Sequence, residues 1–100
     1  MNLTNIDFQD KIENGISLVK FNAGWCGPCK RYAPIFDKFS ENNPNINCYS
    51  VDCDNEITLA EEYSIMSIPV TLLFKDGELI EKKQGILSEE QLSELIKSCE

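Results

Sequence analysis

Two cysteines separated by two residues are the part of the sequence best suited to chemistry. Cys26 and Cys29 lie in the string Trp25-Cys26-Gly27-Pro28-Cys29, between an apolar stretch and a helical pattern. At the start of a helix, free backbone N–H groups and the positive end of the dipole favour a thiolate over a thiol. We therefore expect Cys26 to be a nucleophile of lowered pKa, and Cys29, one turn further on, to be more buried and less acidic. Such a pair suits thiol–disulfide exchange.

The three remaining cysteines do not complete a metal site. Two cysteines with this spacing are also half of a zinc site, but Cys48 and Cys53 are five residues apart, on opposite faces of one predicted strand or just beyond it. That arrangement disfavours zinc and iron–sulfur clusters. Cys99 lies on the apolar face of the last predicted helix and is interpreted as a core residue. The strand-helix-strand context favours redox chemistry over a purely structural pair of cysteines.

Composition excludes several other classes of function. The 100 residues fit one domain, residues 1–100, and the charged side chains are nine basic and seventeen acidic, which gives a net charge of −8. Such an acidic chain is expected to bind neither nucleic acid nor an anionic membrane surface. Histidine is absent, which excludes Ser-His and Cys-His catalysis and His-ligated metal sites.

The compartment is predicted from the start of the sequence and its cysteines. The first residues carry neither a basic segment nor a long apolar run, so no signal peptide is expected. No stretch approaches the ~20 apolar residues of a membrane span. An odd number of cysteines, five, disfavours a fully cross-linked secreted scaffold. The sequence therefore predicts a protein of the reducing cytoplasm.

The elements that must hold the dithiol follow from hydrophobic periodicity and turn signals. The predicted order is α-β-α-β-α-β-β-α, with helices at 5–14, 26–42, 57–63 and from Ser88 onward, and strands at 17–22, 46–52, 70–74 and 79–84. Thr4 or Asn5 is the expected N-cap of the first helix, and Ser88 begins a capping box. A strand-helix-strand unit implies parallel pairing, and Asp76-Gly77 implies an antiparallel hairpin. The fold class is α/β, a mixed sheet between helices.

These motifs together resemble the thioredoxin family over nearly the whole chain. The resemblance is carried by Trp25-Cys26-Gly27-Pro28-Cys29-Lys30, Ala33-Pro34, Ile68-Pro69 with the strand that follows it, Lys75-Asp76-Gly77, Gly85, and Leu87-Ser88 with Gln91-Leu92. It implies a thioredoxin-like fold, an α/β/α sandwich around a central mixed β-sheet. The family's long first strand is nearly missing here, because at most residues 1–4 are available for it.

The resemblance also implies roles for individual residues. Pro69 would follow a cis peptide bond opposite the two sulfurs, which leaves the Ile68 backbone free to pair with an extended client segment. The client groove would be lined by Trp25, Gly27, Pro28, Ile68, Pro69 and Gly85. The implied partners are client proteins with disulfides and a thioredoxin-reductase-type enzyme that recharges the dithiol. The resemblance implies a monomer with no bound cofactor beyond the redox-active Cys26–Cys29 disulfide.

Lys20 is the main departure from the family pattern. It stands where the family carries a buried aspartate beneath the resolving cysteine, and that aspartate's usual lysine partner on the neighbouring strand matches Cys48. A buried, neutral Lys20 would accept a proton, whereas a charged Lys20 would stabilise a thiolate on Cys29. The remaining interpretation is a stem that reaches the edge of the sheet and leaves the amine in water.

The function that the sequence favours is a protein-disulfide reductase, an electron carrier in cell redox homeostasis. Cys26 would attack a client disulfide, and Cys29 would resolve the mixed disulfide. An oxidase or isomerase of shifted potential is the alternative that Lys20 suggests. A non-catalytic thioredoxin-like binding subunit is a third interpretation, which the intact Trp25-to-Cys29 string disfavours.

Overall fold

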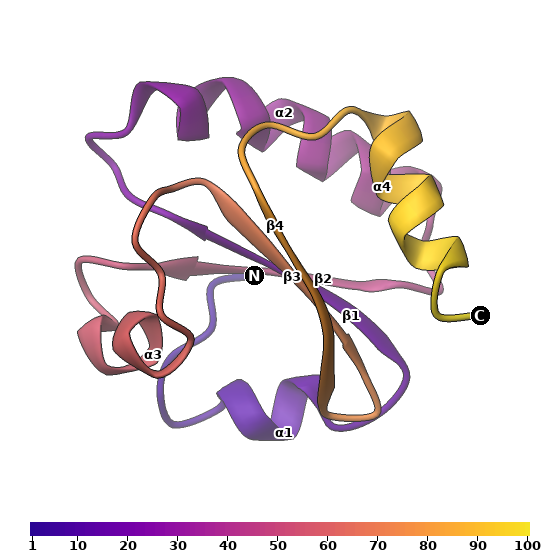
Figure 1. Cartoon of the computed structure of the whole chain (residues 1–100), viewed down its shortest axis with the longest axis horizontal. Helices are drawn as coiled ribbons and strands as arrows, with labels where there is room; N and C mark the ends of the chain where they lie inside the picture. Colours follow the sequence, from indigo (N-terminus) through magenta and orange to yellow (C-terminus); the bar gives the residue numbers. More distant parts are fainter.

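A four-stranded sheet lies between two layers of helices in the computed structural model, which describes residues 1–100 (Figure 1). Helices α2 and α4 cover one face of the sheet, and α1 and α3 lie on the other side (Figure 1). The elements in chain order are α1 (Phe8–Ile12), β1 (Ile16–Asn22), α2 (Gly27–Asn42), β2 (Asn47–Asp52), α3 (Ile57–Glu62), β3 (Val70–Lys75), β4 (Glu78–Gln84) and α4 (Glu89–Lys97).

The strand order is β2-β1-β3-β4. β1 pairs in parallel with β2 and antiparallel with β3, and β3 pairs antiparallel with β4. Asp76 and Gly77 both have positive φ, 49° and 86°, at the turn between β3 and β4. Two left-handed residues in succession are typical of a tight hairpin, so the predicted mixed sheet and its hairpin are confirmed.

The core is divided by the sheet into two apolar clusters. The cluster under α2 and α4 contains Leu18, Tyr32, Phe36, Leu73 and Leu92, among others. The cluster on the side of α1 and α3 is built from Leu3, Phe8, Phe21, Leu59, Phe74 and neighbouring residues. Because β1 lies between both clusters, its residues 17–21 are all buried. That burial is what a mostly apolar central strand predicts.

The predicted order of elements is confirmed, and most boundaries agree within one or two residues. The first helix is shorter than predicted and begins at Phe8, with Asp7 rather than Thr4 or Asn5 at the N-cap. The cause is a local turn, in which Asp7 Oδ1 accepts hydrogen bonds from the Thr4 N–H at 2.7 Å and from the Thr4 hydroxyl at 3.1 Å. The predicted capping box of α4 is present: Ser88 Oγ accepts from the Gln91 N–H at 3.1 Å.

The shortening of the family's first strand is confirmed as well. Only one bridge, between Asn2 and Ser50, adds the N-terminal residues to the edge of β2. It consists of hydrogen bonds from the Leu3 N–H to Ser50 O and from the Ser50 N–H to Met1 O, at 2.7 and 2.9 Å.

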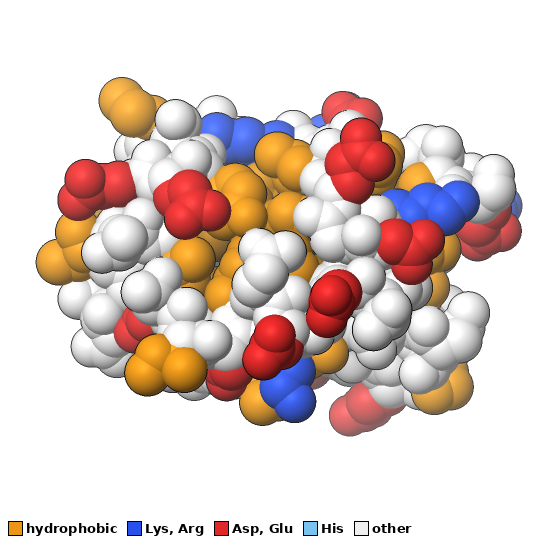
Figure 2. Space-filling view, turned by 90° about the horizontal axis from the view of Figure 1, so that it is seen from below, with side chains coloured by type: hydrophobic (Ala, Val, Ile, Leu, Met, Phe, Trp, Pro, Cys, Tyr) orange, Lys and Arg blue, Asp and Glu red, His pale blue; other side chains and the backbone are white.

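The surface agrees with the composition. Figure 2 shows Asp and Glu side chains distributed around a central area of hydrophobic atoms on the face seen from below. None of the helices combines the length and the apolar character that crossing a bilayer requires.

Candidate active site

The two cysteines of the predicted dithiol meet at the start of α2. Cys26 is the N-cap residue, with extended backbone (φ −86°, ψ 112°), and forms a disulfide with Cys29. The Cys29 N–H points at Cys26 Sγ, 3.2 Å away, so this sulfur accepts one of the free N–H groups of the helix. Pro28 lies in the first turn, where its missing N–H costs no helical hydrogen bond. This is the geometry that the spacing predicts.

Burial does not separate the two cysteines as expected. Cys26 is 4% exposed and Cys29 is 3% exposed in the disulfide form, so burial differs little between the two residues. Both residues pack with Ala23 and Ile68 in one small cluster, because the ring that the disulfide closes holds both sulfurs against the end of β1. In the disulfide form, the feature that distinguishes Cys26 is the helix N–H group that its sulfur accepts.

The wall opposite the sulfurs is the segment that leads into β3. Ile68 O lies 3.8 Å from Cys26 Sγ, and the Ile68–Pro69 peptide bond is cis. The Gly85 N–H donates to Pro69 O at 2.8 Å, which ties the end of β4 to this loop. Gly85 has a φ of +94°, and a Cβ built there would meet no atom within 4 Å. The absence of a side chain at Gly85 therefore leaves open the surface beside Pro69.

Trp25 lies at the surface beside the dithiol and is 71% exposed, which confirms the interpretation that it is not a core residue. Its indole Nε1–H donates to Asp54 Oδ1 at 3.3 Å. Asp54 is held in turn by its own N–H, which donates to Asp52 Oδ1 at 2.9 Å. Sequence reasoning missed Asp54, because nothing in a loop 29 positions away marks an acceptor for an indole.

Lys20 is buried, at 4% exposure, in the middle of β1. The amine itself makes no hydrogen bond within the protein and is not among the fully buried polar atoms, so the interpretation that the stem reaches the edge of the sheet and leaves the amine in water stays a prediction. The strand register pairs Lys20 with Ser50 and pairs Cys48 with Leu18, so Cys48 lies diagonally across from Lys20 rather than directly opposite it. Lys20 Nζ lies 5.4 Å from the centre of the Phe36 ring. Burial lowers the pKa of Lys20, and the negative charge of Asp37 acts in the opposite direction.

A buried hydrogen bond joins α2 to β3 beneath the dithiol. The Tyr32 hydroxyl and Thr71 Oγ1 lie 2.8 Å apart, and both residues are fully buried. Burial raises the pKa of Tyr32 to about 12, although the bond to Thr71 lowers it and the nearby Cys48 raises it. Tyr32, Phe36 and Phe39 recur at helical spacing on the buried face of α2, but the partner of the Tyr32 hydroxyl depends on the strand register.

The other three cysteines do not join the dithiol. Cys48 and Cys53 are free and half-buried, and they pack against opposite core clusters, as predicted. Burial raises the pKa of both thiols, with Asp52 and Asp54 adding to the effect at Cys53. Cys99 is buried in the core under α4, also as predicted. No group of three or more His, Cys, Asp or Glu side chains is placed to hold a metal ion.

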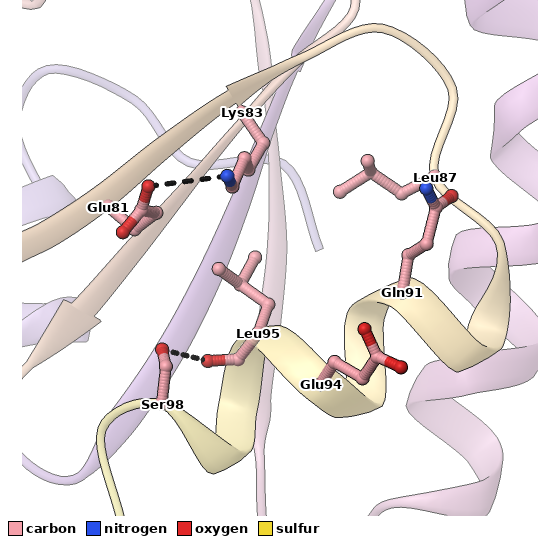
Figure 3. A pocket seen from close by; sticks show the side chains of 7 residues that line it. All are labelled: Glu81, Lys83, Leu87, Gln91, Glu94, Leu95 and Ser98. Atoms are coloured by element: carbon pink, nitrogen blue, oxygen red, sulfur yellow. Dashed lines mark hydrogen bonds and ion pairs between the residues drawn. The ribbon is translucent and has the colours of Figure 1, made fainter.

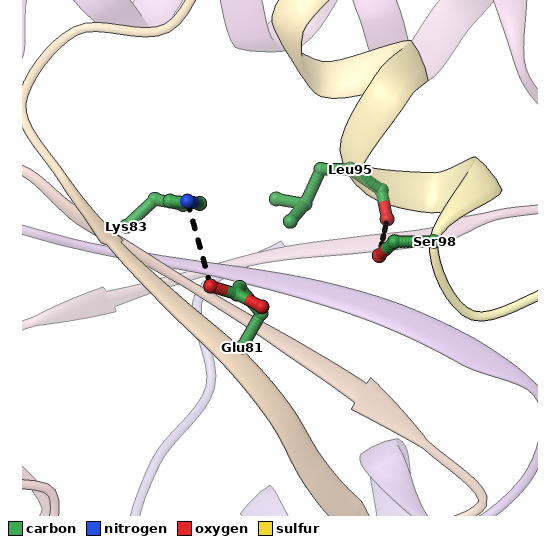
Figure 4. A network of polar contacts seen from close by, with 4 residues as sticks. All are labelled: Glu81, Lys83, Leu95 and Ser98. Carbon is green, nitrogen blue, oxygen red and sulfur yellow. Dashed lines mark hydrogen bonds and ion pairs between the residues drawn. The ribbon is translucent and has the colours of Figure 1, made fainter.

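A hollow of about 330 Å³ lies away from the dithiol, between β4 and α4 (Figure 3). Leu87 and Leu95 form its apolar part. Glu81 and Lys83 form an ion pair at 3.4 Å, and Ser98 Oγ donates to Leu95 O at 2.6 Å (Figure 4). The polar groups of Glu81, Lys83 and Ser98 therefore already have partners within the protein.

The thioredoxin family model matches residues 1–98. The chain belongs to the thioredoxin family. It is 39% identical over 95 residues to a thioredoxin of Staphylococcus epidermidis, an alignment that covers 94% of this chain and 91% of that one. A thioredoxin of Chlamydia trachomatis is also 39% identical, over 90% of this chain and 88% of that one.

A solved structure agrees with the assignment to this family. It comes from work on the thiol resolving mechanism of a yeast mitochondrial 1-Cys peroxiredoxin through glutathione and thioredoxin systems. One chain of that structure has a TM-score of 0.89 and 32% identity, and the match covers 98% of this chain and 93% of that one. With the family shown and the Cys26–Cys29 disulfide in place, the chain is a thiol–disulfide oxidoreductase.

Proposed function

We propose that this thioredoxin reduces disulfides of client proteins, with Cys26 as the nucleophile and Cys29 as the resolving cysteine. The observation that supports these roles is the hydrogen-bond geometry of Cys26 Sγ, which accepts the Cys29 N–H at the start of a 16-residue helix. In the reduced protein the same N–H group and the positive end of the helix stabilise a thiolate on Cys26. Cys29 lies inside the first turn, where its sulfur reaches that of Cys26.

The reaction consists of two exchange steps. The Cys26 thiolate attacks one sulfur of the client disulfide, a mixed disulfide forms, and the other client sulfur leaves as a thiolate. Cys29 then loses its proton and attacks Cys26 Sγ, which breaks the mixed disulfide and releases the second client thiolate. The client gains two electrons, and the protein is left with the Cys26–Cys29 disulfide.

The client groove would lie along the surface around the dithiol. Ile68 and Gly85 offer backbone groups beside the sulfurs, and Trp25 offers an exposed apolar ring. Gly27 and Pro28 are exposed at the start of α2 and present no bulky side chain to an approaching backbone. An extended client segment could then pair with the Ile68 backbone while its sulfur meets Cys26.

The remaining parts of the proposal follow from membership of the thioredoxin family. Residues 1–100 act as one domain and a monomer, without a bound cofactor. A thioredoxin-reductase-type enzyme returns the disulfide to the dithiol, and the protein works in the cytoplasm. The acidic composition supports the absence of nucleic-acid and membrane partners.

Insulin reduction by dithiothreitol tests the proposal. The chain is expected to accelerate the appearance of turbidity, and the Cys26→Ser variant, matched in size, is expected to do so no faster than the reagent alone. Equal rates with and without the chain would instead support a binding subunit. Equilibration with dithiothreitol redox buffers then gives the potential, and a strongly oxidising value would favour the oxidase or isomerase.

A further inference from the structure

Lys20 is the only charged residue in the buried set, and the reaction described above does not use it. Lys20 as a whole is 4% exposed, and its ammonium, which is not among the fully buried polar atoms, makes no ion pair. The closest feature is the face of the Phe36 ring, 5.4 Å from Nζ to its centre, a distance at which a cation and an aromatic ring attract each other. A buried cation without a counter-ion is unfavourable in a folded protein.

The position of Lys20 relates it to the dithiol. Ala23 lies three residues after Lys20 and packs in one cluster with Cys26 and Cys29. Phe36, which the ammonium faces, lies seven residues after Cys29 and therefore on the same face of α2, about 10 Å further along the axis. The cation thus lies between β1 and the active-site helix α2.

The groups around Lys20 leave the positive charge largely uncompensated. Asp37 of α2 is the one carboxylate that acts on it, at a range longer than an ion pair. The neighbours of Lys20 in the sheet are Ser50 and Thr71, and the Thr71 hydroxyl is bonded to Tyr32. Burial keeps the Tyr32 hydroxyl and the Cys48 thiol in their neutral forms at neutral pH. From α4, only apolar side chains and Cys99 enter this core.

We propose that Lys20 is a redox-linked positioning residue whose ammonium stabilises the reduced, thiolate form of the Cys26–Cys29 pair and thereby raises its reduction potential. The inference rests on the proposed function, because it concerns the same dithiol. The disulfide takes up two electrons and one proton to give one thiolate and one thiol. The negative charge exists only in the reduced form, so only that form is stabilised by the cation.

The size of the effect follows from the separation. For a cation and a thiolate on the order of 12 Å apart, with an effective dielectric constant between about 20 and 80, Coulomb's law gives a stabilisation by a factor of roughly two to ten. The equilibrium constant with a reference dithiol changes by the same factor, which corresponds to roughly 10 to 30 mV for a two-electron couple. The Lys20→Met variant, which keeps the length of the stem but loses the charge, is therefore expected to be the stronger reductant.

Equilibration with dithiothreitol redox buffers at a series of pH values tests the inference. Lys20→Met is expected to have a potential below that of the wild type, by the amount given above, whereas Lys20→Arg retains the charge and is expected to match the wild type. The difference in potential between the wild type and Lys20→Met should be present only in a window of pH. It closes below the thiol pKa, where the reduced form has no charge, and above the pKa of Lys20, where the amine is neutral.

Two outcomes would overturn the inference. One is a Lys20→Met potential equal to that of the wild type at every pH, and the other is a difference that does not vary with pH, which indicates altered packing. Lys20→Gln serves as a second uncharged variant if Lys20→Met does not fold. Wild-type insulin reduction reports on the proposed function separately, so the inference can fail while that function stands.

Discussion

The buried hydrogen bond between Tyr32 and Thr71 predicts a specific pattern of stability in mutants. The two oxygens lie 2.8 Å apart, and both residues are fully buried. Tyr32→Phe leaves Thr71 Oγ1 without a partner, and Thr71→Val leaves the Tyr32 hydroxyl without one. Each single change is expected to lower the free energy of unfolding by about 1–3 kcal/mol, which is the cost of a buried, unpaired polar group.

The double variant is the informative member of the cycle. Replacing both residues removes both polar groups, so its free energy of unfolding is expected to lie closer to that of the wild type than the sum of the single changes predicts. The coupling energy should reach about 1–2 kcal/mol. Urea unfolding of the four proteins at neutral pH measures it, provided that the dependence on urea concentration is the same for all four. Additive effects would refute the reasoning.

Alkaline pH provides a second readout of the same residue. Because burial raises the pKa of Tyr32 to about 12, the unfolded chain loses this proton first, near pH 10. Stability is therefore expected to fall as the pH rises from about 10 through 12, by about 2–3 kcal/mol from this group. Tyr32→Phe should lose that part of the decline. An unchanged alkaline decline in the variant would contradict the assignment.

Three further predictions concern other parts of the chain. Cys29→Ser should accumulate a mixed disulfide between Cys26 and a client, visible by non-reducing electrophoresis, and the absence of such a species would count against the resolving role. Trp25→Ala should slow insulin reduction at least severalfold while the melting temperature changes little, because the side chain is 71% exposed; an unchanged rate would remove Trp25 from the groove. Ser88→Ala should lower the free energy of unfolding by about 1 kcal/mol through loss of the capping box, and no change in urea unfolding would contradict that estimate of the cap.

Much of the fold could be predicted because local signals agree with the tertiary structure. Alternation along β2 and into the residue that follows it assigns Cys48 and Cys53 to opposite sides, and the Ser88 capping box marks the start of α4. The first helix was predicted too long because the side chain of Asp7 bonds back to Thr4, a turn that competes with helical hydrogen bonds.

The candidate site shows which features a sequence leaves undetermined. The spacing of Cys26 and Cys29 is sufficient to predict the disulfide at the helix start, because both residues belong to one turn. The partners of Trp25 and Tyr32 come from distant segments, through Asp54 and Thr71, and only the strand register brings these side chains together. Burial of Lys20 likewise depends on α2 covering the middle of β1.

The central claim is that helix N–H groups hold the sulfur of Cys26 as a thiolate in the reduced protein. Alkylation of the fully reduced chain with iodoacetamide at a series of pH values, followed by mass spectrometry of the modified peptide, measures this most directly. The account predicts that Cys26 reacts first and that its rate rises at a pH below about 8.5, the value for an unperturbed thiol, whereas Cys29 remains unmodified there. A Cys26 rate that rises only at or above that pH would contradict the account.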